Sequence, residues 1–372
     1  MTISRPVAFY APLKSPSHPL PSGDRTMARL LMKALEGAGY SPLVASEVRT
    51  LDRTGDRQRQ ESLREQSLEE ADRLIAHYRA LPEGMRPCLW FTYHVYYKAP
   101  DWIGPLVADA LGIAYAIAEG SRAAKRAQGP WALGHQGAEA ALGRADAILV
   151  MTAHDREALE AARPQHQVLV DLPPFLDLQE WPASGSRPLP VAEPRLLAVA
   201  MMRPGDKLAS YRILAAALDR LRHLPWTLDV VGDGEARDEV ARLLSPLAQR
   251  VRFHGQIESK ADLKALYEAA DLLVWPAVNE AYGMVLLEAQ ALGCAVIAGA
   301  YGGVASVVRD GETGMLTRPG DVAAFADALS ELLQDRERLR ALGASAFRFV
   351  RQDRDLDHAA LRLRNALAPL TD

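Results

Sequence analysis

The sequence has 372 residues, of which 49% are hydrophobic, and a formal net charge of −4 at pH 7. This length allows two domains with separate cores, and the nearly balanced charge argues against a nucleic-acid-binding surface. The only cysteines, Cys88 and Cys294, form no disulfide or metal-binding pattern. Residues 1–10 lack the apolar region typical of a signal peptide, and no apolar run is long enough to span a bilayer. We expect a cytoplasmic protein, for which peripheral membrane contact stays open.

In the first half of the chain, short apolar runs alternate with amphipathic or polar segments. The apolar runs predict strands at residues 7–10, 89–94, 112–118, 147–151 and 168–170. The intervening segments predict helices at residues 24–37, within 47–86, up to 143 and at 155–162. Strands that alternate with helices form parallel sheets, so residues 1–182 predict a Rossmann-like domain.

Several polar residues of this half lie where a strand ends or a helix begins. Gly23, Asp24 and Arg25 follow a loop with four prolines and start the first helix, as a cap or as substrate contacts. His94 and Glu119 each end a predicted strand. Ligands of doubly wound domains bind at the carboxyl ends of strands, so both side chains are expected to face the ligand crevice.

Aromatic and basic residues follow these two strand ends. Tyr96, Tyr97 and Trp102 come after His94, and they suit either the core or stacking against a sugar ring. A basic cluster comes after Glu119: Arg122, Lys125 and Arg126. Glu119 could orient an acceptor, hold a cationic acceptor or pair with Arg122.

The second half repeats the alternation after a proline-rich linker at residues 183–194. Strands are predicted at residues 195–200, 227–231, 251–253, 272–275 and 294–298. Helices are predicted at residues 207–221, 235–244, 260–269, 284–292 and 323–333, and over much of 339–367. We expect a second Rossmann-like domain over 195–345 and a C-terminal helix over 346–372, which could pack back on the first domain.

The stretch from residue 272 to 288 reads as strand, loop and helix, with the loop at the ligand-binding end of the strand. A glycine in the loop lets a ligand approach the backbone, and the first N–H groups of the helix have no partner inside it. These groups favour an anion and lie around Gly283, Met284 and Val285.

Two carboxylates flank this anion site. Glu280 lies in the loop, and Glu288 lies roughly one turn inside the helix. Each can accept hydrogen bonds from hydroxyls on one side of a bound phosphate, as a nucleotide sugar requires. The alternative is a capping acid and a surface acid.

Two cations follow the first strand of the second domain. Arg203 and Lys207 lie in a strand-to-helix loop, where they could bracket a diphosphate and stabilise the charge on a leaving nucleoside diphosphate. The turn at residues 232–234 is not a dinucleotide fingerprint, because Arg237 occupies the third glycine position. No Walker motif occurs.

Together these features resemble the GT-B glycosyltransferases, in particular the large retaining family numbered four, also called group 1. The matching segments cover most of the second domain: 203–207, 232–234, 263–275, 280–288 and 295–317. In the first domain the match is residues 141–159 and the order of elements. The resemblance implies an α/β protein of two Rossmann-like doubly wound domains that face a central cleft.

The resemblance also implies roles for the residues above. Arg203 and Lys207 would bind the diphosphate, Glu280 the hydroxyls of the transferred sugar, and Glu288 the ribose. Transfer would retain the anomeric configuration without metal or cofactor, and the acceptor, which could be a saccharide, a lipid or a small molecule, would bind near His94 and Glu119.

The sequence departs from the family pattern at two places. The Arg203–Lys207 spacing is one residue shorter than the usual R-x4-K, and Glu119 stands where the family often has histidine. Two further functions therefore stay open: a GT-B epimerase or phosphorylase, and a non-catalytic sugar-nucleotide-binding protein. A pyridoxal-dependent phosphorylase would need a Schiff-base lysine, and the second domain offers only three: Lys207, Lys260 and Lys264.

Overall fold

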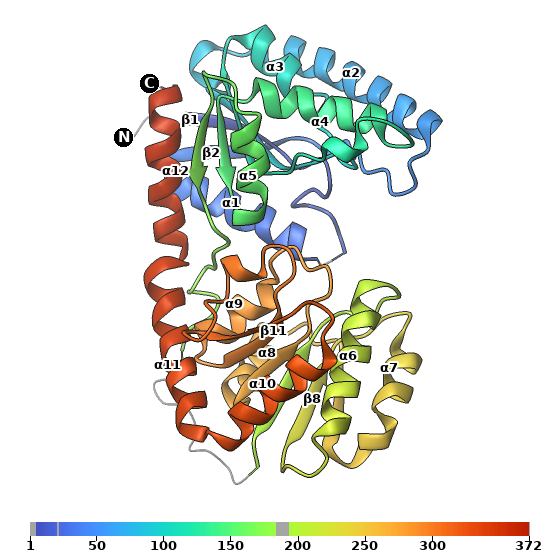
Figure 1. The fold of residues 1–372 in the computed structure, drawn as a ribbon. Coiled ribbons are helices and arrows are strands. Elements are labelled where there is room, and N and C mark those ends of the chain that lie inside the picture. Colours follow the sequence, from blue (N-terminus) through green and yellow to red (C-terminus); the bar gives the residue numbers. More distant parts are fainter. Residues whose placement is uncertain (1–4, 21, 184–192, 372) are drawn as a thin grey trace. The chain divides into compact units, whose positions relative to one another are not determined.

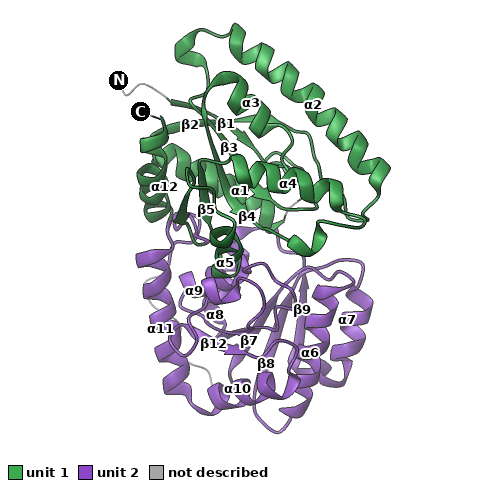
Figure 2. Cartoon of the chain, turned by 45° about the horizontal axis from the view of Figure 1, so that its top comes forward, with its two compact units in different colours: residues 1–173, 356–372 green, residues 174–355 purple. Residues whose placement is uncertain are grey.

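The computed structural model describes residues 5–20, 22–183 and 193–371. The chain forms two compact units, of which unit 1 comprises residues 1–173 and 356–372 and unit 2 comprises residues 174–355 (Figure 2). Most of the expected linker, at residues 184–192, lies outside the described residues. No helix in the described part of the chain is long and apolar enough to cross a membrane.

Unit 1 is built on a six-stranded parallel sheet with the order β2-β1-β3-β4-β5-β6. Its strands are β1 (Arg5–Tyr10), β2 (Tyr40–Ser46), β3 (Leu89–Val95), β4 (Ala114–Gly120), β5 (Ala147–Val150) and β6 (Val168–Asp171). The central strands β3, β4 and β5 are almost wholly buried. Their continuous apolar runs are typical of a sheet covered on both faces.

Helices connect these strands. They are α1 (Gly23–Gly37), α2 (Arg57–Ala80), α3 (Gly104–Leu111), α4 (Ala132–Arg144), α5 (Ala153–Ala161) and α12 (Leu356–Thr371). The last helix, red in Figure 1, packs against α1. There the Arg364 side chain donates a 2.7 Å hydrogen bond to the Gly37 carbonyl, and a 2.9 Å bond joins the hydroxyls of Tyr40 and Thr371.

Unit 2 has a second six-stranded parallel sheet, with the order β12-β11-β10-β7-β8-β9. Its strands are β7 (Arg195–Val199), β8 (Thr227–Val231), β9 (Val251–Gly255), β10 (Leu272–Trp275), β11 (Ala295–Gly299) and β12 (Gly314–Thr317). Its helices are α6 (Asp206–Arg220), α7 (Arg237–Leu244), α8 (Lys260–Ala269), α9 (Met284–Ala291), α10 (Val322–Gln334) and α11 (Arg336–Asp353).

The structure confirms two Rossmann-like α/β domains and the predicted strands and helices, with ends shifted by a few residues, except at the C-terminus. The single helix expected over 346–372 is divided into α11 and α12, and the chain passes from unit 2 to unit 1 between residues 355 and 356 and not at 345. Among the strands and α-helices of the described residues, the sequence analysis missed β2, α3 and β12. Strand β2 contains Pro42 and exposes Leu43, which is permitted because β2 lies at the sheet edge. Helix α3 was hidden by its Gly-Pro start, although proline suits the first helical turn.

The direction of the connections reverses once in each sheet. In unit 1, β1 leads outward to β2 while β3 lies on its other side, so the reversal falls between β1 and β3. In unit 2 it falls between β7 and β10. Loops that leave such a switch point in opposite directions open a crevice at the carboxyl ends of the two strands. The candidate residues lie at the ends of the strands, in the loops that follow them or in the helices that come next.

Candidate functional site

The loop that follows β7 is held by glycines of the next strand-to-helix turn. A Cβ on Gly232 would lie 1.9 Å from the Ala200 carbonyl oxygen, and one on Gly234 would lie 2.4 Å from that of Met202. The Met202 N–H also donates a 2.8 Å hydrogen bond to the Asp233 carbonyl. The Gly232–Gly234 turn therefore supports the backbone that leads to Arg203 and Lys207.

The loop that follows β10 meets the start of α6. Lys207 forms an ion pair with Glu280, and their side chains are 25% and 19% exposed. The Lys207 ammonium also lies 5.5 Å from the centre of the Trp275 ring, whose Nε1 donates a 3.4 Å hydrogen bond to Glu280. The structure thus brings together two of the predicted residues from opposite sides of the unit 2 switch point.

Further contacts fix the position of this loop. The Asn279 amide donates to Asp206 at 3.0 Å, and the Val278 N–H donates to the Ser210 hydroxyl at 2.9 Å. Asn279 and Ala277 both adopt left-handed backbone conformations, with φ of 50° and 54°. Such strain in non-glycine residues persists where surrounding contacts determine the backbone.

The predicted anion site at the start of α9 has the expected backbone. Gly283 is the N-cap residue with φ of 77°, and no side chain caps the helix. Met284 and Val285 form its first turn. Arg203, by contrast, is exposed and makes no ion pair within the described residues. Its contact with a diphosphate stays a prediction.

Glu288 contacts a different residue from the Lys207–Glu280 pair. It accepts a 2.8 Å hydrogen bond from the Tyr267 hydroxyl, and burial raises the pKa of its carboxyl. Tyr267 in turn contacts the Trp181 ring edge-on, with 5.8 Å between centres. Sequence reasoning missed Tyr267, which lies in an ordinary amphipathic helix and gave no local signal.

Unit 1 gathers a histidine and two carboxylates at its own switch point. The Nδ1 atom of His94 lies 3.4 Å from Asp24 Oδ1 and 3.6 Å from Glu119 Oε1. His94 and Glu119 end adjacent strands with φ of 66° and 61°. This left-handed conformation is uncommon for residues other than glycine, and it accompanies the convergence of the two side chains.

The charges in this cluster depend on one another. Burial opposes protonation of His94, but the charge of Glu119 and the nearby Asp24 carboxylate outweigh it and raise the pKa of His94 to about 9. Burial also raises the pKa of the Glu119 carboxyl, which His94 only partly offsets. For Asp24, contact with His94 overcomes burial and lowers the pKa. These shifts favour a protonated imidazole beside an ionised Asp24.

The neighbouring predicted residues anchor the loop before α1. Ser22 caps the helix, in place of the Gly23–Asp24 cap weighed above. Arg25 donates to the carbonyls of His18 and Pro19 at 2.9 and 3.0 Å, so it ties down the proline-rich loop. A Cβ on Gly23 would meet no atom within 4 Å, so packing does not require glycine there.

Asp155 is a residue that the sequence did not single out. It accepts hydrogen bonds from Ser121 and Thr152, both of 2.5 Å, and its charge helps to raise the pKa of His94. The sequence signal that could have identified Asp155 was its place in a helix cap. Thr152 is the N-cap residue of α5, and its hydroxyl accepts a hydrogen bond from the Asp155 N–H. Unit 1 thus holds more negative charge at this site than sequence reasoning foresaw.

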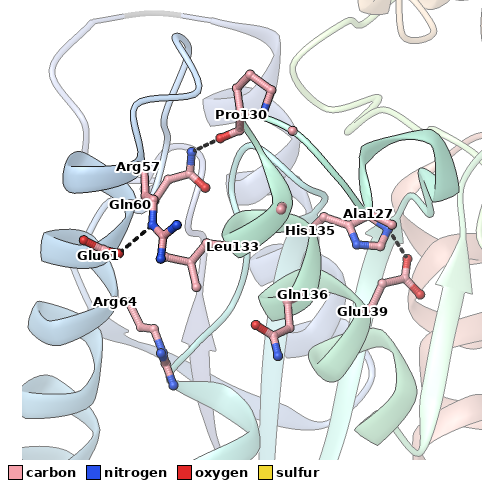
Figure 3. Close-up of a pocket in the computed structure, with 12 residues that line it drawn as sticks. Arg57, Gln60, Glu61, Arg64, Ala127, Pro130, Leu133, His135, Gln136 and Glu139 are labelled. Carbon is pink, nitrogen blue, oxygen red and sulfur yellow. Dashed lines mark hydrogen bonds and ion pairs between the residues drawn. The ribbon is translucent and has the colours of Figure 1, made fainter.

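Unit 1 also contains a pocket of about 760 Å³ between α2 and the start of α4 (Figure 3). Gln60 reaches across it and donates a 2.8 Å hydrogen bond to the Pro130 carbonyl. On the α4 side, Glu139 lies near His135 and pairs with Arg122. None of the predicted site residues is among the described residues that line this pocket.

The pair of Rossmann-like domains, each with polar groups at its switch point, defines a protein of the GT-B fold. Sucrose-phosphate synthase from Thermosynechococcus elongatus aligns with a TM-score of 0.75 at 23% identity, covering 98% of this chain and 99% of that one. Anabaena HepE in complex with UDP-glucose aligns with a TM-score of 0.69 at 16% identity, covering 98% and 100%. These similarities confirm the predicted fold.

Within this fold, residues 193–335 match the model of the family described as Glycosyl transferases group 1. A relative from Geodermatophilus obscurus, named D-inositol 3-phosphate glycosyltransferase, is 32% identical over 297 residues, covering 73% of this chain and 63% of the relative. A relative of the same name from Nocardia farcinica is 49% identical over 84 residues, covering 23% and 19%. The chain therefore spans less than two thirds of the length of these relatives.

Proposed function

We propose that this chain is a retaining glycosyltransferase that transfers a sugar from a nucleoside-diphosphate sugar to an acceptor hydroxyl. The observation that carries the proposal is the Lys207–Glu280 pair at the switch point of a group 1 domain. UDP-glucose in the HepE structure, which shares this fold, supports a nucleotide sugar as the donor. The relatives' name supports glycosyl transfer as the reaction.

In this proposal the two sites of the chain have separate tasks. Lys207 exchanges Glu280 for the donor diphosphate, assisted by Arg203 and by the N–H groups at the start of α9. Glu280, once released, accepts hydrogen bonds from the transferred sugar. Glu288 binds the ribose, and the Asp24–His94–Glu119 cluster orients the acceptor.

The proposed chemistry exchanges one bond at the anomeric carbon for another. The bond from this carbon to the diphosphate oxygen breaks, and a bond to the acceptor oxygen forms on the same face. The acceptor proton passes to the departing phosphate, whose charge Lys207 and Arg203 stabilise. These cations and the α9 helix start serve in place of a metal ion, and we place the reaction in the cytoplasm.

The lysines of unit 2 favour this function over a pyridoxal-dependent phosphorylase. Each has a carboxylate partner: Lys207 with Glu280, Lys260 with Glu180, and Lys264 with Glu268. A Schiff-base lysine is activated in a desolvated or cationic environment, because there its pKa falls. Carboxylate partners stabilise the protonated amine instead.

Product analysis tests the proposal. The protein is incubated with a panel of nucleoside-diphosphate sugars and acceptors, and the products are identified by mass spectrometry and NMR. We expect a new glycoside of retained configuration, free nucleoside diphosphate, and an unchanged rate in EDTA. An isomerised sugar nucleotide would indicate an epimerase, and binding without turnover a non-catalytic protein.

The Glu280→Gln variant assigns the transferred sugar. It should lower turnover much more than it weakens nucleoside-diphosphate binding, because Glu280 addresses the sugar. Binding can be followed by thermal shift, since a ligand at one hundred times its Kd stabilises the folded state by about 2.7 kcal/mol. Equal losses in turnover and binding would remove Glu280 from this role.

A further inference from the structure

Glu288 is held by the protein at one of its two carboxylate oxygens. The Tyr267 hydroxyl donates a 2.8 Å hydrogen bond to Glu288 Oε2, and no other hydrogen bond or ion pair joins this side chain to the described residues. The side chain is only half-buried. The second oxygen, Oε1, can therefore accept hydrogen bonds from a ligand.

The position of Glu288 in α9 directs its side chain toward the predicted anion site. Helical side chains tilt toward the N-terminus of their helix, so each residue covers the turn that precedes it. The turn that precedes Glu288 begins with Met284 and Val285, whose N–H groups belong to the unpaired first turn of the helix. The carboxylate thus lies about one helical turn from an anion bound there, roughly 5.4 Å along the axis.

Tyr267 is itself fixed within unit 2. Among the residues of α8, all of which the structure describes, it is the only buried one, and it is fully enclosed. Trp181 packs edge-on against its ring, with 5.8 Å between centres. The preceding residue, Glu180, pairs with Lys260 at the start of the same helix. Two contacts from one segment therefore hold the helix that carries the Tyr267 hydroxyl.

The hydrogen bond also keeps Glu288 an acceptor. Burial raises the pKa of the Glu288 carboxyl and the Tyr267 hydrogen bond lowers it, while the charges of Lys260 and Glu180 act in opposite directions. Burial and the charge of Glu288 raise the pKa of the Tyr267 hydroxyl, which therefore stays protonated and donates. Without this hydroxyl the carboxylate would rotate more freely and take up a proton more easily.

We propose that Tyr267 is a positioning residue for the donor ribose. Its hydroxyl holds Glu288 Oε2 so that Oε1 accepts hydrogen bonds from the 2′- and 3′-hydroxyls. The inference rests on the proposed function, in which Glu288 binds the ribose, and adds a residue that acts on the ribose through Glu288. A tyrosine with only a structural role would support nucleotide binding as a whole, whereas a positioning tyrosine supports the contact with the ribose hydroxyls alone.

Removal of the ribose hydroxyls separates these two roles. UDP, GDP and ADP are titrated into the full chain by calorimetry, and the tightest binder is compared with its 2′,3′-dideoxy form. Wild type should prefer the ribose form at least about tenfold, because hydrogen bonds to a carboxylate are strong. Tyr267→Phe, which keeps the ring, should weaken the ribose form roughly three- to tenfold and leave the dideoxy form unchanged. Equal losses for both forms, or no loss for either, would overturn the assignment.

Tyr211→Phe is the matched control. Tyr211 is another buried tyrosine of unit 2, and it packs edge-on against Trp275 with 5.1 Å between ring centres. Its hydroxyl donates a 3.0 Å hydrogen bond to the Ala200 carbonyl and not to a carboxylate. Tyr211→Phe should leave the ratio of the two affinities unchanged. An equal fall of this ratio in both variants would show that loss of any buried hydroxyl produces the effect, which would overturn the role of Tyr267.

A double-mutant cycle tests whether Tyr267 acts through Glu288. Glu288→Ala should abolish the preference for ribose, and Tyr267→Phe in that background should change neither affinity further. A second loss of ribose affinity would show that Tyr267 acts independently of Glu288 and would overturn the proposal. Thermal melting checks that each variant folds. If Tyr267→Phe does not, Trp181→Phe decides: it loosens the packing of the Tyr267 ring and should lower the ribose preference, and an unchanged preference would overturn the proposal.

Failure of this inference and failure of the proposed function give different results. Calorimetry needs neither acceptor nor turnover, so the ribose preference and its loss in Tyr267→Phe persist even in a chain that transfers no sugar. If the chain transfers sugar, Tyr267→Phe should raise the donor KM and leave kcat unchanged, because the ribose contact is the same in the ground and transition states. If Tyr267→Phe retains the wild-type ribose preference, this inference fails while the proposed transfer stands. A chain that binds none of the three nucleoside diphosphates contradicts both.

Discussion

The switch points of the two units hold charge in different ways. In unit 2 one cation, Lys207, faces one carboxylate, Glu280, on loops supported by glycines and backbone hydrogen bonds. In unit 1 a single histidine lies between two carboxylates, and His94 and Glu119 take left-handed conformations without being glycine. In the proposed function, Lys207 of unit 2 leaves Glu280 to bind an incoming anion, whereas the carboxylate oxygens of unit 1 accept hydrogen bonds from hydroxyl groups.

Of the changes considered, removal of the Lys207 side chain should have the largest effect, and the affected quantity is nucleoside-diphosphate affinity. Lys207→Ala deletes a charge-assisted contact of about 1.5–3 kcal/mol to the diphosphate, so nucleoside-diphosphate affinity should fall roughly 10- to 150-fold. The melting temperature without ligand should change little, because a partly exposed ion pair contributes little stability. Calorimetry and thermal melting measure the two quantities.

A second ion pair of unit 2 supplies the control for Lys207→Ala. Lys264 pairs with Glu268 at 2.9 Å, with side chains 19% and 18% exposed. Lys264→Ala should leave nucleotide affinity unchanged. A similar loss of affinity in both variants would show that net charge, and not the switch-point cation, binds the phosphates.

The pH dependence of stability should come next in size. The pKa of His94 is about 9 in the folded state, against about 6.5 for an unperturbed histidine. Protonation therefore stabilises the fold fully below pH about 6.5, and this contribution disappears as pH rises through about 9. It amounts to at most about 3 kcal/mol. Denaturant unfolding of wild type and His94→Gln at pH 6 and 10 should show the difference between them shrinking, and a constant difference would contradict it.

Substitutions on the acceptor side should separate transfer from donor binding. Glu119→Gln and His94→Ala should each lower transfer at least tenfold, about 1.4 kcal/mol of barrier, since both orient the acceptor in the proposed function. Donor affinity should stay within about threefold, because the proposed nucleotide site lies in unit 2. Steady-state kinetics with titrated acceptor measure the first quantity and donor calorimetry the second. Wild-type transfer rates would move the acceptor site elsewhere, with the loop at residues 14–25 as the next candidate.

The smallest effect concerns the backbone beneath the donor site. Gly283→Ala places a Cβ at φ of 77°, 3.0 Å from Leu286 Cδ1 and 3.3 Å from Glu280 Cγ. It should destabilise unit 2 by about 1 kcal/mol and also reduce transfer. Gly311→Ala is the control, with φ of 72° and nothing within 4 Å of its Cβ. Gly311→Ala should lower stability without lowering the rate of transfer. If both variants lose stability and transfer to the same extent, Gly283 has only a structural role.

Sequence alone determined most of the elements and the position of key residues at strand ends. Apolar runs and helical periods are local, so the strand before His94 and the helix after Gly283 could be predicted from their own residues. Edge strand β2 escaped because Pro42 and an exposed Leu43 remove the local pattern.

Only the tertiary structure decided which of these residues meet. Asp24, His94 and Glu119 converge because β1, β3 and β4 are neighbours in the sheet, and the left-handed backbone at two of them accompanies that convergence. Likewise, Tyr267 donates its hydrogen bond to Glu288 because α8 packs against α9. Sheet order and side-chain direction depend on contacts between segments distant in the chain, and no local pattern of residues encodes such contacts.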